Sequence, residues 1–244
     1  MTKVFAHRGA SGYAPENTLA AFQLAMDLGA EGIELDVQMT SDKELVVIHD
    51  ETLDRTTNGK GWVKDHTIAQ IKKLDASMGS TQYPDQTVPT LDEVFALLED
   101  TQMFINIEIK NSRVPYPGIS QEVLSRIDNR DWEHRVIISS FNHMTLAELR
   151  QLGSLVNTGM LFQDVLFEPW AYAHQLWATA MHPHFMYVDA VPNFVTEAHN
   201  SLLEVNVWTV NEAEDMDRMI GVRVDSIITN FPDLALERRR ILNP

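Results

Sequence analysis

Short apolar runs alternate with helical patterns along nearly the whole chain, and this alternation limits the possible folds more than any other feature. Strands and helices that alternate in sequence are typical of a parallel sheet covered by helices. About eight such units in a chain of this length favour an α/β fold of the TIM-type (β/α)8 barrel class over a doubly wound sheet. No glycine-rich dinucleotide fingerprint follows the first run, which also argues against the doubly wound fold.

Local signals place the individual elements. Asn17 stands where a residue caps a helix, and Gly29 stands where that helix ends. Thr90 and Glu93 form a capping-box pattern at the start of another helix. The expected strands are 3–6, 32–39, 44–48, 104–110, 136–141, 158–162, 186–189, 205–210 and 226–229. The further expected helices are 68–74, 91–98, 120–127, 144–152, 170–180, 195–203 and 213–220.

The second and third strands are too close in sequence for a parallel crossover, so we expect an antiparallel hairpin. With Ser41 and Asp42 as the turn residues, Glu34 faces His49 across the hairpin. Directly opposed side chains share a face, with Cβ atoms about 4.5–5.5 Å apart. This pairing depends on the turn, because a shift of one residue moves every side chain to the other face.

Residues 50–88 depart from the alternation because they are polar and rich in turn residues. Segments of this kind commonly lie over the rim of a barrel, where binding loops are found. We therefore expect one catalytic domain over residues 1–244, with a small insertion at about 50–88 that follows the strand before His49.

Composition narrows the possible partners. The chain has 19 Lys and Arg against 35 Asp and Glu, a net charge of −16, which argues against nucleic acids and anionic membranes. It has no cysteine, which excludes disulfides and thiolate metal sites. We see neither a signal-peptide core nor an apolar run of the roughly 18–20 residues needed for a membrane span. We expect a soluble cytoplasmic protein, and the sequence leaves its oligomeric state open.

Carboxylates gather on the inner face of two expected strands. Alternation puts Glu34 and Asp36 on one face of the second strand. In 104–110 the isoleucines face the helices, which turns Asn106, Glu108 and Lys110 inward. The acids Glu34, Asp36 and Glu108 suit an oxygen-ligated Mg²⁺ or Ca²⁺ better than Zn²⁺.

Two histidines and an arginine complete this group. His7 and His49 can supply a general acid and a general base near neutral pH. Arg8 has the shape to grip a phosphate. Each pattern alone has a structural explanation, such as a strand end, a solvated strand face or an internal ion pair. Their conjunction at one end of one barrel favours metal-assisted chemistry on a phosphate ester.

Other histidines and tryptophans carry weaker signals. No acidic pattern accompanies the histidines at positions 174, 182 and 184, so we interpret them as loop or surface residues. Trp170 and Trp177 share a helical face, which favours packing. Trp208 lies near the end of a late strand, where it belongs either to the barrel core or to the wall of a substrate pocket.

At this point the sequence resembles the bacterial, cytosolic glycerophosphodiester phosphodiesterases nearly from end to end. The matching blocks are AHRGASGYAPENTLAAF (6–22), GAEGIELDVQMTSDKELVVIHDETLDRTTNGKG (29–61), VPTLDEV (88–94), INIEIK (105–110), SSF (139–141), WTVN and SIITNFPD. The resemblance implies a TIM-type barrel with a small insertion after the strand of the second histidine. It also implies a divalent cation, Mg²⁺, Ca²⁺ or Mn²⁺, held by Glu34, Asp36 and Glu108, and acid–base roles for His7 and His49.

The same resemblance implies phosphate contacts from Arg8 and Lys110, and places Trp208 beside the glycerol part of the substrate. The chain departs from the family at one point. Members often have Gly-Ile-Ile-Thr-Asp near the last strand, whereas this chain has Ser226 and Asn230 in those places. The role of Asn230 therefore stays open.

The implied function is metal-dependent hydrolysis of glycerophosphodiesters, such as glycerophosphocholine and glycerophosphoethanolamine, to sn-glycerol 3-phosphate and an alcohol. One histidine would deprotonate the glycerol 2-hydroxyl and the other would protonate the departing alcohol, in an order that the sequence does not fix. One alternative is a lysophospholipase D or phospholipase C-like activity on lipids, for which 50–88 offers few apolar residues. Another is a protein that binds glycerophosphodiesters without turning them over.

Overall fold

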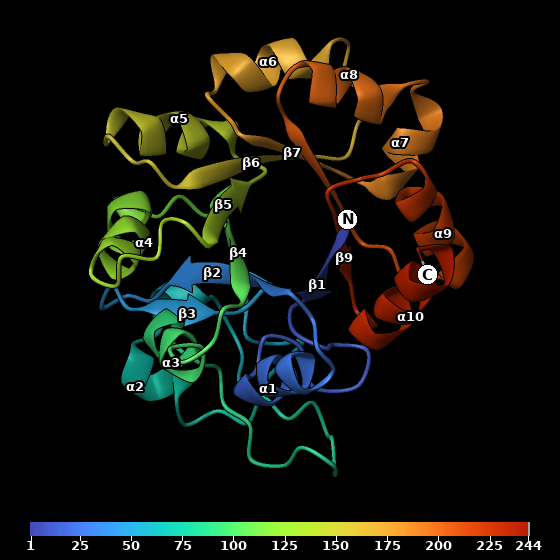
Figure 1. Cartoon of the computed structure of the whole chain (residues 1–244). Coiled ribbons are helices and arrows are strands. Elements are labelled where there is room, and N and C mark those ends of the chain that lie inside the picture. The colour runs from blue at the N-terminus through green and yellow to red at the C-terminus, as the bar shows by residue number, and fades with distance from the viewer. Residues whose placement is uncertain (244) are drawn as a thin grey trace.

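The computed structural model describes residues 1–243, so the last residue of the expected 1–244 domain lies outside the described part. Within that part, parallel strands close into a barrel of eight, because β1 pairs with both β2 and β9 (Figure 1). The predicted (β/α)8 barrel is confirmed. The barrel strands are β1 (Lys3–His7), β2 (Gly32–Met39), β4 (Phe104–Ile109), β5 (Val136–Ser140), β6 (Asn157–Phe162), β7 (Ala180–Pro183), β8 (Glu204–Val207) and β9 (Ser226–Thr229).

Helices surround the barrel in Figure 1, and the main core lies between the two layers. On β2, Ile33, Leu35 and Val37 are buried in this core together with Phe22 and Phe95 from the helices. The described residues include no helix that is long and apolar enough to cross a membrane. The helices are α1 (Leu19–Asp27), α2 (Ile68–Ile71), α3 (Leu91–Leu97), α4 (Ile119–Asp128), α5 (His143–Gln151), α6 (Pro169–Gln175), α7 (Phe185–Ala190), α8 (Phe194–Asn200), α9 (Ala213–Gly221) and α10 (Pro232–Leu242).

Strand β3 (Leu45–Val47) pairs antiparallel with β2, as predicted, but in a register shifted by one residue. Val37 pairs with Val47, so the expected pairing of Glu34 with His49 is wrong. The turn is one residue longer than expected, because Lys43 adopts a left-handed conformation with φ of 68°. The backbone N–H of Thr40 then donates to the carbonyl of Glu44 at 3.0 Å and closes the longer turn.

The segment 50–88 shares a second apolar cluster with residues of β3 and of the chain just after it. It contains the short 3₁₀ helix η1 (Val63–Asp65) and α2. Thr67 and Gln70 form a capping box that starts α2. The buried members of this cluster are Val46, Ile48, Leu53, Val63, Ile71, Ala76 and Val88. The loops of this segment are therefore held against the barrel by packed apolar side chains.

The seventh barrel strand lies earlier in the chain than predicted. The expected strand 186–189 is part of α7, which begins where the His184 side chain accepts from the N–H of Met186. The expected helix 170–180 already ends at Gln175, because Trp177 takes a left-handed φ of 54° and frees the next residues for β7. A short apolar run such as 185–188 fits a strand and a helix turn equally well, which explains the error.

Three smaller expectations also need correction. Thr18, not Asn17, caps α1, since its side chain accepts from the N–H of Ala21. Trp177 is 59% exposed, so its predicted packing role is wrong, whereas Trp170 packs against the core. Helix α10 was not expected, because its run of charged residues hides the helical pattern that begins at Pro232.

Candidate active site

A pocket opens at the carboxyl ends of the barrel strands. It brings together residues that are far apart in sequence, including most of those that the sequence predicted. Its lining residues are His7, Arg8, Glu34, His49, Asn106, Glu108, Lys110, Phe141, Leu161, Trp208, Thr209 and Ile228. This is the end of a (β/α)8 barrel at which functional residues are found.

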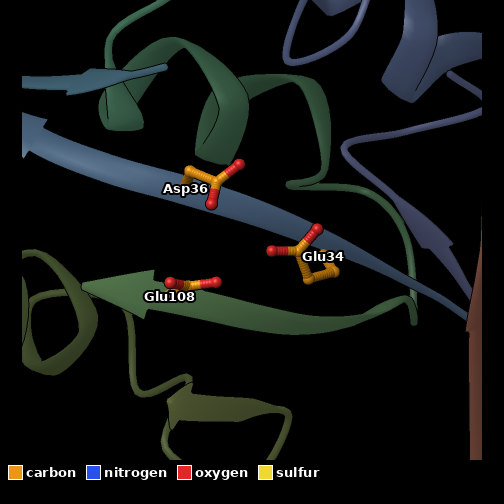
Figure 2. Close-up of side chains that lie close together, drawn as sticks. All are labelled: Glu34, Asp36 and Glu108. Atoms are coloured by element: carbon orange, nitrogen blue, oxygen red, sulfur yellow. The ribbon is translucent and has the colours of Figure 1, made fainter. Parts of the chain in front are cut away.

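The predicted acidic triad lies on two adjacent strands. Glu34 and Asp36 come from β2 and Glu108 comes from β4, with Asp36 and Glu108 paired in register. Figure 2 shows the three carboxylates turned toward one another, and each offers one oxygen within 4.8 Å of the others. All three are buried, and Asp36 Oδ1 has no hydrogen-bond donor among the described residues.

Burial and mutual repulsion set the charge of this triad. The pKa of Glu34 lies well above its usual value because the carboxyl is buried and because Asp36 and Glu108 repel its charge. Burial also raises the pKa of Glu108, although Lys110 works against it. For Asp36, Arg8 and Lys110 outweigh the effect of burial and hold the pKa below its usual value. A buried set of oxygen ligands with excess negative charge and an unsatisfied acceptor fits a hard divalent cation.

Arg8 reaches the pocket because of the chain turn after β1. Arg8 and Gly9 both have left-handed φ angles, 55° and 79°, and a Cβ at Gly9 would meet the backbone of Ala21 at 2.6 Å. This turn lets the Arg8 N–H donate to Glu34 Oε2 at 2.9 Å. The Arg8 guanidinium lies 3.3 Å from Asp36 through Nε. The Arg8-Gly9 sequence is therefore needed for the tight turn that brings Arg8 to the acids.

Lys110 stands on the opposite side of the triad, just after β4. Its Nζ donates to Glu108 Oε1 at 2.8 Å, and lies 3.2 Å from His49 Nε2 and 3.9 Å from Asp36 Oδ1. Arg8 and Lys110 thus place positive charge on either side of the acids, in a protein whose net charge is −16. This is the local concentration of positive charge that an anionic ligand requires.

His7 is fixed by neutral partners. Its Nδ1 lies 2.7 Å from Asn230 Oδ1, which also accepts from the Ser11 hydroxyl at 3.0 Å. Because an amide oxygen only accepts, His7 Nδ1 carries the proton and Nε2, 4.0 Å from Glu34 Oε2, is a free acceptor. Burial, together with neighbouring Arg8, lowers the pKa of His7 to about 4.

His49 is fixed by a charged partner. Its Nδ1 lies 2.7 Å from Asp50 Oδ1. A hydrogen bond from Arg55 holds the pKa of Asp50 far below its usual value, so Asp50 is ionised. The carboxylate can only accept, so the Nδ1–H of His49 donates to it and Nε2 faces Lys110 in the pocket.

Trp208 is a wall of the pocket, which answers the question that its sequence position left open. Its Nε1–H donates to the carbonyl of His182 at 2.8 Å. The Phe141 ring meets it edge-on, with centroids 5.4 Å apart. The two rings give one side of the pocket an apolar face next to the charged groups.

His182, expected in a loop or at the surface, is instead buried inside the barrel on β7. Asn206 Nδ2 donates to its Nε2 at 3.0 Å, and Ser226 donates to Asn206 Oδ1 at 2.6 Å. Gly159 makes room for the ring, since a Cβ there would lie 2.4 Å from His182 Nε2. The expectation failed because 180–183 was not identified as a strand. His184 is half-buried, and the histidine at position 174 is exposed as expected.

Sequence reasoning also missed Asn17 as a site residue. Its Nδ2 donates to Asp36 Oδ2 at 2.9 Å from a buried position with a φ of 57°. Its position before the α1 stretch favoured the capping interpretation, and no local pattern distinguishes the two roles. Arg55 and Glu16 were likewise not singled out.

A sequence profile of the Glycerophosphoryl diester phosphodiesterase family matches residues 7–234. The chain belongs to this family. The glycerophosphodiester phosphodiesterase of Caldanaerobacter subterraneus subsp. tengcongensis is 48% identical to it over 236 residues, which cover 96% of each chain. The expectation that the chain is an enzyme of this family, a phosphoric diester hydrolase, is confirmed.

Solved structures of glycerophosphoryl diester phosphodiesterase relatives have the same barrel. The glycerophosphodiester phosphodiesterase of Agrobacterium tumefaciens superposes with a TM-score of 0.86 at 30% identity, covering 97% of this chain and 100% of that one. A phosphodiesterase of Oleispira antarctica, in complex with the product sn-glycerol-3-phosphate, gives a TM-score of 0.87 at 27% identity. That alignment covers 98% of this chain and 96% of the relative.

Proposed function

We propose that the chain hydrolyses glycerophosphodiesters, such as glycerophosphocholine and glycerophosphoethanolamine, to sn-glycerol 3-phosphate and an alcohol. The presence of His7, His49 and a buried acidic triad at one pocket carries this proposal. The sn-glycerol-3-phosphate held by the Oleispira relative supports it. We propose further that residues 1–244 act as one catalytic domain in the cytoplasm, with 50–88 as its insertion, on a small-molecule substrate and without nucleic acid.

One divalent cation, Mg²⁺, Ca²⁺ or Mn²⁺, would be held by Glu34, Asp36 and Glu108. When bound, such an ion offsets the charge of the triad and of the phosphate, and polarises oxygens that contact it. The buried Asp36 Oδ1 without a donor and the raised pKa values of Glu34 and Glu108 both support a cation here.

The proposed reaction uses the two histidines in turn. One takes the proton of the glycerol 2-hydroxyl as this oxygen attacks phosphorus, and the other protonates the departing alcohol. Water then opens the cyclic glycerol phosphate, with the two roles exchanged. Nε2 of His7 and Nε2 of His49 are the atoms that hold or release these protons, because the Nδ1 atoms are bonded to Asn230 and Asp50.

Arg8 and Lys110 bind the equatorial phosphate oxygens in this proposal. Their positions on either side of the triad support it, since cations fixed before the reaction stabilise developing charge without reorganisation. Trp208 and Phe141 pack against the carbon atoms of the glycerol, which an apolar wall excludes from water.

Glycerol 3-phosphate release from glycerophosphocholine and glycerophosphoethanolamine, with choline release from lysophosphatidylcholine measured in parallel, tests the proposal. We expect release from the first two within minutes, with choline or ethanolamine in equal amount. Tight binding of glycerophosphocholine with no product would instead identify a binding protein.

One observation favours a second candidate, a lysophospholipase D activity on lipids. The structure exposes large apolar side chains in the first turns of α5 and α7 and in the connection between β6 and α6, at the barrel end where the pocket opens. These residues are Met144, Val165, Phe167 and Met186. They lie outside 50–88, where few apolar residues were available. Release of choline and lysophosphatidic acid from lysophosphatidylcholine, at a rate above that with glycerophosphocholine, would favour this candidate.

A further inference from the structure

We propose that Arg55, in the insertion, is a positioning residue that holds His49 and Arg8 in place on facing sides of the pocket. The inference rests on the proposed function. It follows from an unbroken chain of hydrogen-bonded ion pairs in which Arg55 is the central member, and none of its contacts is with the acidic triad itself.

The first half of this chain lies behind His49. Asp50 Oδ1 accepts from His49 Nδ1 at 2.7 Å. Arg55 holds the same carboxylate with two bonds, Nε to Oδ2 at 2.7 Å and Nη2 to Oδ1 at 2.9 Å. Paired bonds from a planar guanidinium fix the plane of a carboxylate as well as its position. The orientation of the His49 ring therefore depends on Arg55 through Asp50.

The second half leads to Arg8. Arg55 donates to Glu16 through Nη1 to Oε2 at 2.7 Å and Nη2 to Oε1 at 2.8 Å. Glu16 Oε1 in turn accepts from Arg8 Nη1 at 2.9 Å. A single guanidinium thus binds two carboxylates through three nitrogens, and each carboxylate orients one residue that lines the pocket. An ammonium group cannot reproduce this planar double pairing.

The backbone positions His49 less firmly than it positions the acidic residues of the site, so the His49 ring depends more on side-chain contacts. Glu34, Asp36 and Glu108 stand on parallel strands whose hydrogen bonds fix their positions. His49 follows β3, which pairs antiparallel with β2 outside the closed barrel, and its side chain is 31% exposed. Gln38 Nε2 holds the His49 carbonyl at 3.0 Å, but this bond fixes the backbone and leaves the ring free to turn.

Because Arg55 is partly exposed, its effect on the position of His49 can be measured apart from its effect on the stability of the fold. Its side chain is 42% exposed, and ion pairs in such positions contribute little to folding. We therefore expect Arg55→Met to stay folded with at most a small loss of Tm, and to lose kcat by about 10- to 100-fold, the usual effect of removing a partner that orients a site residue. Arg55→Lys should recover only part of kcat, because it keeps the charge without the planar pairing.

Arg113→Met is the matched control. Arg113 is another arginine near the pocket, 73% exposed, that pairs at 3.4 Å with Glu51, the neighbour of Asp50, and contacts neither histidine. It should keep the wild-type kcat. In addition, the loss of kcat in Asp50→Asn combined with Arg55→Met should be smaller than the product of the two single losses, because both changes break the same support of His49 and only the support of Arg8 through Glu16 is lost in addition. Independent, multiplicative losses would overturn the proposal.

A measurement without turnover distinguishes failure of this inference from failure of the proposed function. The imidazole ¹⁵N shifts of His49 and His7 report their tautomers and hydrogen bonds whether or not any substrate is hydrolysed. Arg55→Met should shift the His49 Nδ1 signal and leave that of His7 unchanged, whereas Arg113→Met should shift neither. An unchanged His49 signal in Arg55→Met, or an unchanged kcat, would overturn the proposal.

Discussion

His7 and His49 face the same pocket but are held there by different means. His7 ends a parallel barrel strand, and its Nδ1 is bonded to the neutral amide of Asn230. His49 lies on a loop beyond an antiparallel strand, and its Nδ1 is bonded to the ionised carboxylate of Asp50. The barrel ladder thus positions one histidine directly, whereas a local chain of ion pairs positions the other. The comparison thus sets a neutral partner, the amide of Asn230, against a charged one, the carboxylate of Asp50.

The largest effect is expected from removing either ring. His7→Gln and His49→Gln should each lower kcat by about 10³-fold or more, since general acid–base catalysis supplies effects of this size. The double variant should be little worse than either single one, because the two rings act in one proton-transfer sequence. Steady-state glycerol 3-phosphate release measures this, with the Tm of each variant as the folding control. Wild-type turnover in either folded single variant contradicts the assignment.

A smaller effect is expected from exchanging the partners. Asp50→Asn gives His49 a neutral partner like that of His7, and should lower kcat by about 100-fold because the charged partner is lost. Asn230→Asp gives His7 a carboxylate that still accepts from Nδ1, so kcat should stay within about 10-fold of the wild type. The ratio of the two kcat values is the measurement. Equal losses would show that the histidines do not differ in the way the structure indicates.

The smallest effect concerns a third histidine, the buried His182, and is seen in stability. Burial lowers the pKa of His182 to about 3 in the folded protein, against 6.5 in the unfolded chain. The unfolded chain therefore binds more protons between these values, and stability falls as the pH drops below 6.5. The loss from this group reaches about 2 kcal/mol at pH 5, from about 1.4 kcal/mol for each pH unit.

Urea unfolding of the wild type and of His182→Asn between pH 7 and pH 5 measures that loss. The variant should show a shallower fall in the free energy of unfolding by about 2 kcal/mol over this range. His134→Asn, which changes an exposed histidine, is the control and should follow the wild type. Identical slopes for the wild type and His182→Asn would mean that the buried ring does not resist protonation.

How much the sequence could predict depends on how local each feature is. The barrel and the inward-facing Glu34, Asp36 and Glu108 follow from strand alternation, which operates over a few residues. The predicted hairpin register is wrong because a single left-handed residue, Lys43, lengthens the turn. The prediction of the seventh strand is wrong because a strand of four residues is too short to show a hydrophobic period.

The supports of the two histidines show the limit most clearly. Asn230 lies 223 positions from His7, and closure of the barrel through the pairing of β1 with β9 brings the two together. Glu16 lies 39 positions from Arg55, and the two meet where the loop after β1 approaches the insertion after β3. The predicted site residues could be found because their side-chain types suit the chemistry, and a sequence shows these types directly. The residues that orient them, such as Asn230 and Arg55, can be identified only from their contacts in the folded protein.

Activity and metal binding after chelation test the central claim, that the buried triad holds a cation needed for hydrolysis. Chelated protein should release no glycerol 3-phosphate from glycerophosphocholine, and Mg²⁺, Ca²⁺ or Mn²⁺ should restore release. Calorimetry should show one ion bound per chain, and Glu108→Gln should bind it at least about 10-fold more weakly. Full activity of the chelated protein, or unchanged ion binding by Glu108→Gln, would contradict the account.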